Sequence, residues 1–106
     1  MSAPSITAII IARNEELMLA NCLETLQWCQ EVIVVDTGSD DQTVAIAERL
    51  KAKVIHTTSR SFADRRTLPL ESIKTDWVFY IDADERVTPQ LAKEILVQIE
   101  TTNANA

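Results

Sequence analysis

Four short apolar runs alternate along the chain with longer segments in which apolar residues recur every three or four positions. Short runs rich in β-branched residues are typical of buried strands, and the wider spacing is typical of helices that pack one face on a sheet. The expected strands are residues 5–12, 31–35, 53–56 and 77–81, and the expected helices are residues 14–29, 41–51, the first part of 61–73, and 88–100.

These segments repeat as strand then helix, with connections long enough to hold each helix. Such a pattern predicts an α/β domain with a parallel sheet and right-handed crossovers. We therefore expect a Rossmann-like, three-layer α/β/α domain with about four strands. If strands one and two are neighbours and strand four flanks strand one, the strand order is 3-2-1-4.

Local signals predict where individual helices begin and end. Asn14 suits the N-cap of the first helix, with Glu15 in its first turn. Pro69 is expected to kink or break the third helix near residue 68. Thr88 and Pro89 suit the N-cap and first position of the last helix. The apolar face of that helix is expected to comprise Leu91, Ile95 and Ile99.

Composition limits the function. The chain has 106 residues, close to the commonest domain size, so residues 1–106 are expected to form one domain. Apolar residues make up 46% and charged residues 25%, which excludes gross disorder. The net charge of −6 argues against nucleic acid and anionic membrane as bulk partners, because clustered Lys and Arg bind both. No apolar run approaches the roughly 18 residues that a membrane span needs.

The cysteines and the single histidine indicate no disulfide and no zinc site. Cys22 and Cys29 lie in one predicted helix, roughly 10 Å apart along its axis, too far to bridge. His56 ends a strand without a partner in the sequence, so a structural role is expected. No basic segment precedes the apolar residues 6–12, so they are not interpreted as a secretion signal. A reducing, cytoplasmic setting is therefore expected.

The fourth strand ends in carboxylates. If the backbone stays extended, Asp82 and Asp84 point to the same side, beyond the edge where ligands of open α/β sheets bind. Paired carboxylates suit Mg²⁺ or Mn²⁺, which take further ligands from water and phosphates. Residues 82–85 are also typical of a turn or of the segment that precedes a helix. Taken alone, they favour this structural role over a metal site.

Other strand ends strengthen the functional interpretation. Asp36 ends the second strand and precedes a loop with the chain's only glycine, Gly38. Such a glycine usually marks positive φ or a close backbone approach. With the order 3-2-1-4, a crevice between strands one and four could hold a nucleotide. Asp36 could then accept a hydrogen bond from base or ribose, or it could simply cap the second helix.

Four stretches, residues 12–16, 34–43, 62–66 and 76–85, together resemble the nucleotide-sugar-binding half of family 2 glycosyltransferases, which have the GT-A fold. They follow that family's order and spacing across nearly all of the chain. The finer similarity is to enzymes that transfer sugars to lipopolysaccharide-core or similar cell-envelope acceptors. In a full-length relative the acceptor would be a glycan or lipid-linked molecule, and the expected location is the cytoplasm, at the inner face of the membrane.

The resemblance implies roles for individual residues. Asp36 would contact the uracil or an equivalent base of a UDP-sugar, and Glu15 would lie beside the nucleoside. Arg66 would approach the donor near the diphosphate, and Asp84 would ligate the bridging cation. The predicted substrate-binding residues are Asn14, Glu15, Asp36, Gly38, Arg66 and Asp82, and the predicted metal ligands are Asp84 and Asp82.

The resemblance also implies what this chain lacks. The family's catalytic base lies in a second half, whereas one helix and a tail follow Asp84 here, so a truncated donor-binding domain is expected. An uncovered apolar face would then favour self-association. Thr67 stands where the family usually has Asn, and Thr75 where Gly is common, which affects the geometry around Arg66.

Two other functional classes fit less well. A noncatalytic binding or regulatory module could keep the fold without transfer activity. A flavodoxin-like receiver domain would need an aspartate after its third strand and a lysine after a fifth, whereas the third strand here ends at His56.

Overall fold

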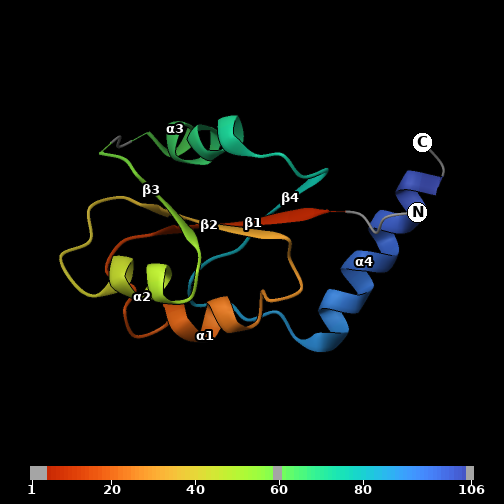
Figure 1. The fold of residues 1–106 in the computed structure, drawn as a ribbon, viewed down its shortest axis with the longest axis horizontal. Coiled ribbons are helices and arrows are strands. Elements are labelled where there is room, and N and C mark those ends of the chain that lie inside the picture. Colours follow the sequence, from red (N-terminus) through yellow and green to blue (C-terminus); the bar gives the residue numbers. More distant parts are fainter. Residues whose placement is uncertain (1–4, 59–60, 105–106) are drawn as a thin grey trace.

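The computed structural model describes residues 5–58 and 61–104. Its elements follow the predicted order and form a parallel sheet flanked by helices (Figure 1). They are β1 (Ile6–Ala12), α1 (Leu19–Glu24), β2 (Glu31–Asp36), α2 (Thr43–Arg49), β3 (Lys53–His56), α3 (Phe62–Thr67), the 3-10 helix η1 (Leu68–Ser72), β4 (Trp77–Tyr80) and α4 (Pro89–Ala104).

The sheet has four parallel strands in the order β3-β2-β1-β4, which confirms the expected topology. Its register aligns the carboxyl ends of three strands, because Ala12 pairs with Asp36 and Asp36 pairs with His56. β4 pairs with the first part of β1, and Tyr80 lies beside Ile9. The polar segments that follow these strands therefore emerge at one edge of the sheet.

Helices cover both faces of the sheet, which gives the three expected layers. In Figure 1, α1 and α2 lie on one face, and α3 with η1 lies on the other. One core cluster joins Ala8, Ile10 and Val34 to apolar residues of α1 and α2. The second joins Ile9, Ile33 and Val35 to residues such as Ile73 and Tyr80 on the opposite face. Alternate residues of β1 and β2 thus point to opposite faces, as the period of a strand requires.

The first helix is shorter than predicted. It begins at Leu19 rather than after Asn14, because Asn14 has a left-handed backbone with φ of 52°, whereas an N-cap residue normally has β-region angles. Met18 is the N-cap, without a side-chain hydrogen bond. The helix ends at Glu24, and tight turns follow in which the N–H of Leu26 bonds the carbonyl of Leu23 at 3.0 Å.

The third helical segment breaks where Pro69 predicts. α3 ends at Thr67, and a 3-10 helix containing the buried Pro69 follows directly. Ser61 caps α3 by accepting a hydrogen bond from the N–H of Asp64 at 3.3 Å. The helix thus gives way to a tighter one near residue 68, as expected.

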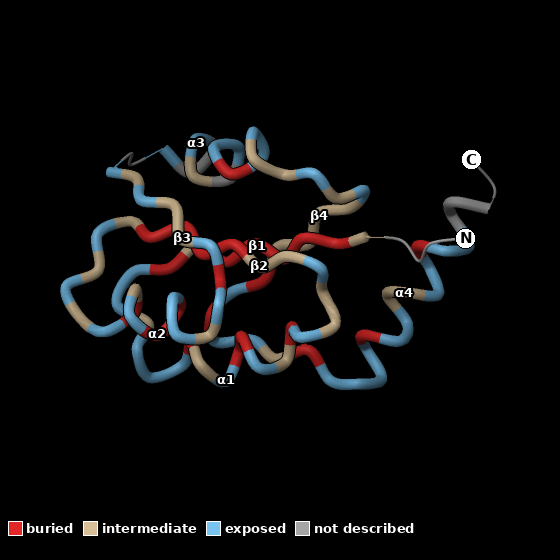
Figure 2. The backbone as a smooth tube through the Cα atoms, in the orientation of Figure 1, coloured by how far each residue is buried: buried red, intermediate tan, exposed pale blue. Residues whose placement is uncertain are grey.

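The last helix begins as predicted but packs differently. The Thr88 hydroxyl accepts a hydrogen bond from the N–H of Leu91 at 3.1 Å, and Pro89 is the first helical residue. Ile99 is buried, but Leu91 is 40% exposed and Ala92 takes its place in the core. The predicted apolar face was therefore wrong at Leu91. Most of α4 is exposed, and it runs past the sheet toward the amino-terminal end of β1 (Figures 1 and 2).

Candidate functional site

Asp36 is a buried carboxylate at the end of β2. It is 4% exposed, and its oxygens accept hydrogen bonds from the N–H groups of Ser39 at 3.2 Å and Gly38 at 3.4 Å. Gly38 has φ of 112°, as the lone glycine predicts. Asp36 therefore holds its own loop and does not cap α2, whose N-cap is Gln42.

His56 contacts the same carboxylate. Its Nδ1 lies 3.4 Å from Oδ2 of Asp36, across the paired ends of β2 and β3. The expectation that His56 has no partner was therefore wrong. The signal was present in the sequence, since both residues end neighbouring strands, but it needed the register of the sheet to become visible.

The loop after β1 is joined by direct hydrogen bonds to the loop of residues 37–42 between β2 and α2, which contains Gly38 and is called the glycine loop below. The backbone N–H of Asn14 donates to Oγ of Ser39 at 2.9 Å, and Oδ1 of Asn14 accepts from the N–H of Asp40 at 2.8 Å. The N–H of Glu15 donates to Oγ1 of Thr43 at 2.8 Å. Four predicted site residues, Asn14, Glu15, Asp36 and Gly38, thus belong to one pair of joined loops.

The acidic end of the fourth strand is a turn rather than an extended segment. β4 stops at Tyr80, and the N–H of Glu85 donates to the carbonyl of Asp82 at 2.9 Å. Oε1 of Glu85 in turn accepts from the N–H of Asp82 at 2.9 Å. The extended backbone assumed for Asp82 and Asp84 was therefore wrong. Both residues are nonetheless exposed at the carboxyl edge of the sheet.

A hollow of about 340 Å³ lies between the ends of β1 and β4, where the strand order reverses. This is the position expected for a ligand crevice in an open α/β sheet. Asp82 belongs to its wall, and Asp36 lies beyond it, on the other side of β1. The hollow is lined by Ile9, Ile11, Arg65, Tyr80, Ile81, Asp82 and Glu85.

Arg65 brings a positive charge to this hollow from α3. The sequence singled out its neighbour Arg66, whose side chain lies outside the described part of the structure. Nothing in the spacing distinguishes two adjacent arginines, because the choice depends on how α3 is rotated against the sheet. Arg65 was therefore missed.

The donors at the acidic turn suit a hard cation that is shared with a phosphate ligand. Among the described residues, no group of three or more His, Cys, Asp or Glu side chains could hold a metal unaided. Mg²⁺ and Mn²⁺ bound with nucleotides commonly use one or two carboxylates and take their other ligands from water and phosphate. Asp82 and Asp84 supply two exposed carboxylates at this edge of the sheet, and Asp82 also lines the hollow.

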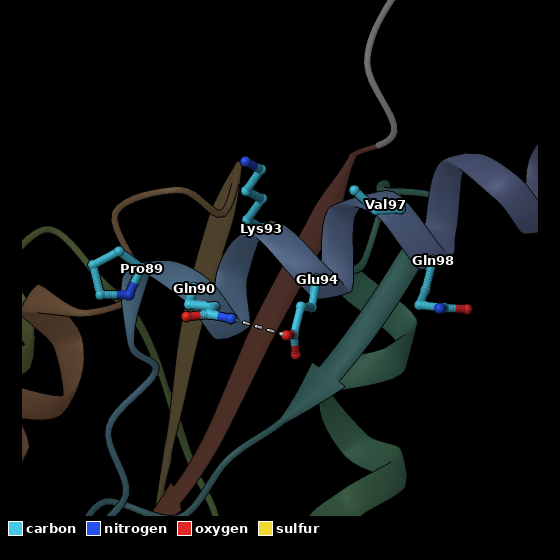
Figure 3. A pocket seen from close by; sticks show the side chains of 6 residues that line it. All are labelled: Pro89, Gln90, Lys93, Glu94, Val97 and Gln98. Carbon is cyan, nitrogen blue, oxygen red and sulfur yellow. Dashed lines mark hydrogen bonds between the residues drawn. The ribbon is translucent and has the colours of Figure 1, made fainter.

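A larger hollow of about 590 Å³ lies elsewhere, alongside α4 (Figure 3). All of its described lining residues come from that one helix, so it is an open helix face and not an enclosed site. Within it, the Gln90 and Glu94 side chains approach each other at 3.5 Å. It contains none of the predicted site residues.

The sequence profile of glycosyl transferase family 2 matches residues 7–106. The chain belongs to this family. It is 34% identical over 99 residues to the lipopolysaccharide core biosynthesis glycosyltransferase LpsC of Rhizobium meliloti (strain 1021), a match that covers 89% of this chain and 36% of the relative. The chain spans about a third of the length of the curated relatives it matches.

Solved structures of other proteins share the fold. A Staphylococcus aureus TarS structure superposes with a TM-score of 0.78 at 24% identity, covering 92% of this chain and 32% of that one. The glucosyl-3-phosphoglycerate synthase of Mycobacterium tuberculosis, solved with Mn²⁺, uridine diphosphate and glucosyl-3-phosphoglycerate, gives 0.71 at 22% identity, covering 88% and 40%. The fold is therefore of the GT-A type. Within the described residues, no helix is long and apolar enough to cross a membrane.

Proposed function

We propose that this chain is the donor-binding part of a glycosyltransferase. It binds a nucleoside diphosphate sugar through a divalent cation, for transfer of the sugar to an acceptor hydroxyl. The observation that carries this proposal is the hollow between β1 and β4, with Asp82 in its wall at the carboxyl edge of the sheet. Membership of glycosyl transferase family 2 makes a sugar donor the natural ligand for that position.

The nucleoside is assigned to the joined loops and the diphosphate to the acidic turn. Asp36 and Asp82 follow strands on either side of β1, so two strand spacings, roughly 10 Å, separate their positions across the sheet. An extended nucleotide can span such a gap. Asp36, Gly38 and Glu15 then serve the base and ribose, and Asp82 serves the ribose or a metal-bound water.

The diphosphate end is held by charge. Arg66 is proposed to approach the phosphates from α3, and Arg65 already reaches the wall of the hollow from the same helix. Asp84 and Asp82 would hold Mg²⁺ or Mn²⁺, which, when bound, neutralises charge on the leaving nucleoside diphosphate. The Mn²⁺ and UDP in the related synthase structure support this cofactor and a uridine nucleotide.

The acceptor is proposed to be a glycan or lipid-linked molecule of the cell envelope. This follows the name of the relative LpsC, of which the chain covers 36%. The reaction would then take place in the cytoplasm, at the inner face of the membrane.

Calorimetric titration of UDP tests the donor site directly. Binding is expected with Mn²⁺ and is expected to be lost with EDTA or in the variant Asp84→Asn. The matched control is Asp76→Asn, which changes an exposed aspartate just before β4, at the opposite end of the same strand. Loss of binding in both variants would point to a general effect of charge or folding and would count against a site at Asp84.

Titration of other nucleotides distinguishes a chain that binds a different donor from a chain that binds none. Failure with UDP followed by binding of GDP, dTDP or ADP would keep the donor site and change the base. Failure with all four would reject the donor site and favour a noncatalytic module of the same fold.

A further inference from the structure

Asn14 is a non-glycine residue in the left-handed region, with φ of 52°. Such a conformation costs most residues roughly 1–2 kcal/mol, although Asn tolerates it better than most. It persists only where surrounding contacts determine it. Asn14 lies two residues after the end of β1 and is exposed, so burial does not hold it in this conformation.

Within the described part of the chain, the hydrogen bonds that hold Asn14 come from the glycine loop. Its N–H donates to the Ser39 hydroxyl at 2.9 Å, and its side-chain oxygen accepts from the N–H of Asp40 at 2.8 Å. One residue therefore uses both its backbone and its side chain to grip two consecutive residues of a loop that lies 25 positions later in the chain.

Glu16 extends this contact between the two loops. The N–H of Glu16 donates to Oδ2 of Asp41 at 3.3 Å, and Oε2 of Glu16 accepts from the N–H of Gln42 at 3.1 Å. Although burial acts to raise it, the pKa of Asp41 is lowered, because Thr43 and the N–H of Glu16 donate hydrogen bonds to its carboxylate. Each of the two loops therefore donates hydrogen bonds to the other and accepts hydrogen bonds from it.

The gripped loop is the one that sets the Asp36 carboxylate. The N–H groups of Gly38 and Ser39 donate to Asp36, and Ser39 also accepts from Asn14. A shift of this loop would move the donors that fix the carboxylate. Fixing them before a ligand arrives removes an ordering cost from binding.

We propose that Asn14 is a positioning residue of the nucleotide site, which clasps residues 38–40 against the end of β1 and so presets Asp36 and Gly38 without touching the ligand. This inference rests on the proposed donor function. It assigns Asn14 a role through the loop in place of the direct contact that its position in the sequence suggests.

A matched pair of glycine variants isolates the clasp. Glycine adopts positive φ freely, so Asn14→Gly removes the side-chain acceptor without straining the backbone. Lys51→Gly makes the same exchange at the other non-glycine residue described with positive φ, 67°, which lies between α2 and β3. Amide exchange at Asp40, measured by NMR without ligand, should become about tenfold faster in Asn14→Gly alone. Unchanged exchange at Asp40 would overturn the proposal.

Nucleotide binding then separates positioning from direct contact. With Mn²⁺ and UDP, Asn14→Gly and Ser39→Ala should each weaken binding up to about tenfold, because each removes one of the two hydrogen bonds between Asn14 and the loop. Weaker binding in Asn14→Gly with unchanged amide exchange at Asp40 would mean that Asn14 contacts the ligand itself and would overturn the inference. If the unmodified chain binds UDP and Asn14→Gly binds it equally well, the inference alone fails. If the unmodified chain binds no nucleotide, the proposed function fails with it.

Discussion

Asp36 and His56 end neighbouring strands and meet there, with Nδ1 of His56 3.4 Å from Oδ2 of Asp36. The two partners differ in exposure, since 66% of the histidine side chain and 6% of the aspartate side chain are accessible. A buried carboxylate needs hydrogen-bond donors, and backbone N–H groups of the glycine loop supply them. The imidazole adds a partner on the solvent side.

Replacing the buried carboxylate should destabilise the loop. Asp36→Asn keeps the shape but leaves one acceptor oxygen where the carboxylate has two, so the N–H groups of Gly38 and Ser39 lose part of their pairing. We expect a loss of about 1–3 kcal/mol in the free energy of unfolding, measured by urea denaturation. Asp40→Asn, an exposed change in the same loop, is the control and should be near neutral. Equal stability of the two variants would contradict the structural role of Asp36.

The solvent-side partner should matter less. In His56→Gln the imidazole is lost but the backbone donors to Asp36 remain, and most of the His56 side chain is already in water. Exposed ion pairs contribute at most about 1 kcal/mol, so the expected loss is smaller than for Asp36→Asn. Denaturation of both variants in parallel tests the ranking. A larger loss for His56→Gln would show that the imidazole is the main partner of the carboxylate.

The sheet could be predicted because its central strands, β1 and β2, are largely buried on both faces. β1 is apolar at nearly every position, and only a strand covered by helices on both sides tolerates that pattern. The parallel arrangement followed from the length of the crossovers, whereas the order 3-2-1-4 rested on the assumption that strand one lies between strands two and four. Long-range polar contacts carry no such periodic signal. The pairing of His56 with Asp36, the grip of Asn14 on Asp40 and the choice of Arg65 for the hollow all depended on the assembled sheet.

Local sequence rules also failed where a specific hydrogen bond opposed them. Asn14 satisfies the composition of an N-cap, yet its hydrogen bonds to the glycine loop hold it in a left-handed conformation and delay the helix to Leu19. Asp82 and Asp84 follow an apolar strand, yet Glu85 folds back on Asp82 and closes a turn. In both cases a tertiary or local hydrogen bond outweighed a propensity of less than about 1 kcal/mol per residue.

A substitution at Gly38 tests how far the loop depends on its backbone conformation. Its φ of 112° is unfavourable for any residue with a Cβ, but a Cβ built there would meet no atom within 4 Å. Gly38→Ala should therefore cost backbone strain alone, about 1–2 kcal/mol of unfolding free energy. Thermal and urea denaturation should agree on this loss. No loss would mean that the loop can move to negative φ, and the hydrogen bonds from Gly38 and Ser39 to Asp36 would not be required for its structure.

The exposed apolar residues of α4 predict self-association. Leu91 is 40% and Val97 50% exposed on a helix that stands away from the sheet. A second copy of the chain could cover them, because exposed apolar surface gains free energy when it is buried. Sedimentation velocity should show a concentration-dependent dimer that weakens in Val97→Glu. The control Gln98→Glu adds the same charge one residue away. A monomer at all concentrations would reject the prediction.

The thiols should be unreactive in the folded chain. Burial raises the pKa of Cys29 from 9.0 to about 12, and it raises that of Cys22 to about 11, where Arg86 offsets part of the effect. At pH 8 both remain protonated, and the thiolate is the reactive form, so alkylation by iodoacetamide should be much slower than in urea. The single variants Cys22→Ser and Cys29→Ser assign the two rates.

The same shifts fix the sign of a pH effect on stability. The folded state retains its thiol protons at a pH where the unfolded chain has lost them, so this contribution is complete below pH 9. It should fall as the pH rises from about 9 toward 11 and 12, and the unfolding free energy should fall with it. Cys22→Ser with Cys29→Ser removes both groups and should flatten the profile in that window. An unchanged slope in the double variant would assign the alkaline loss to other groups.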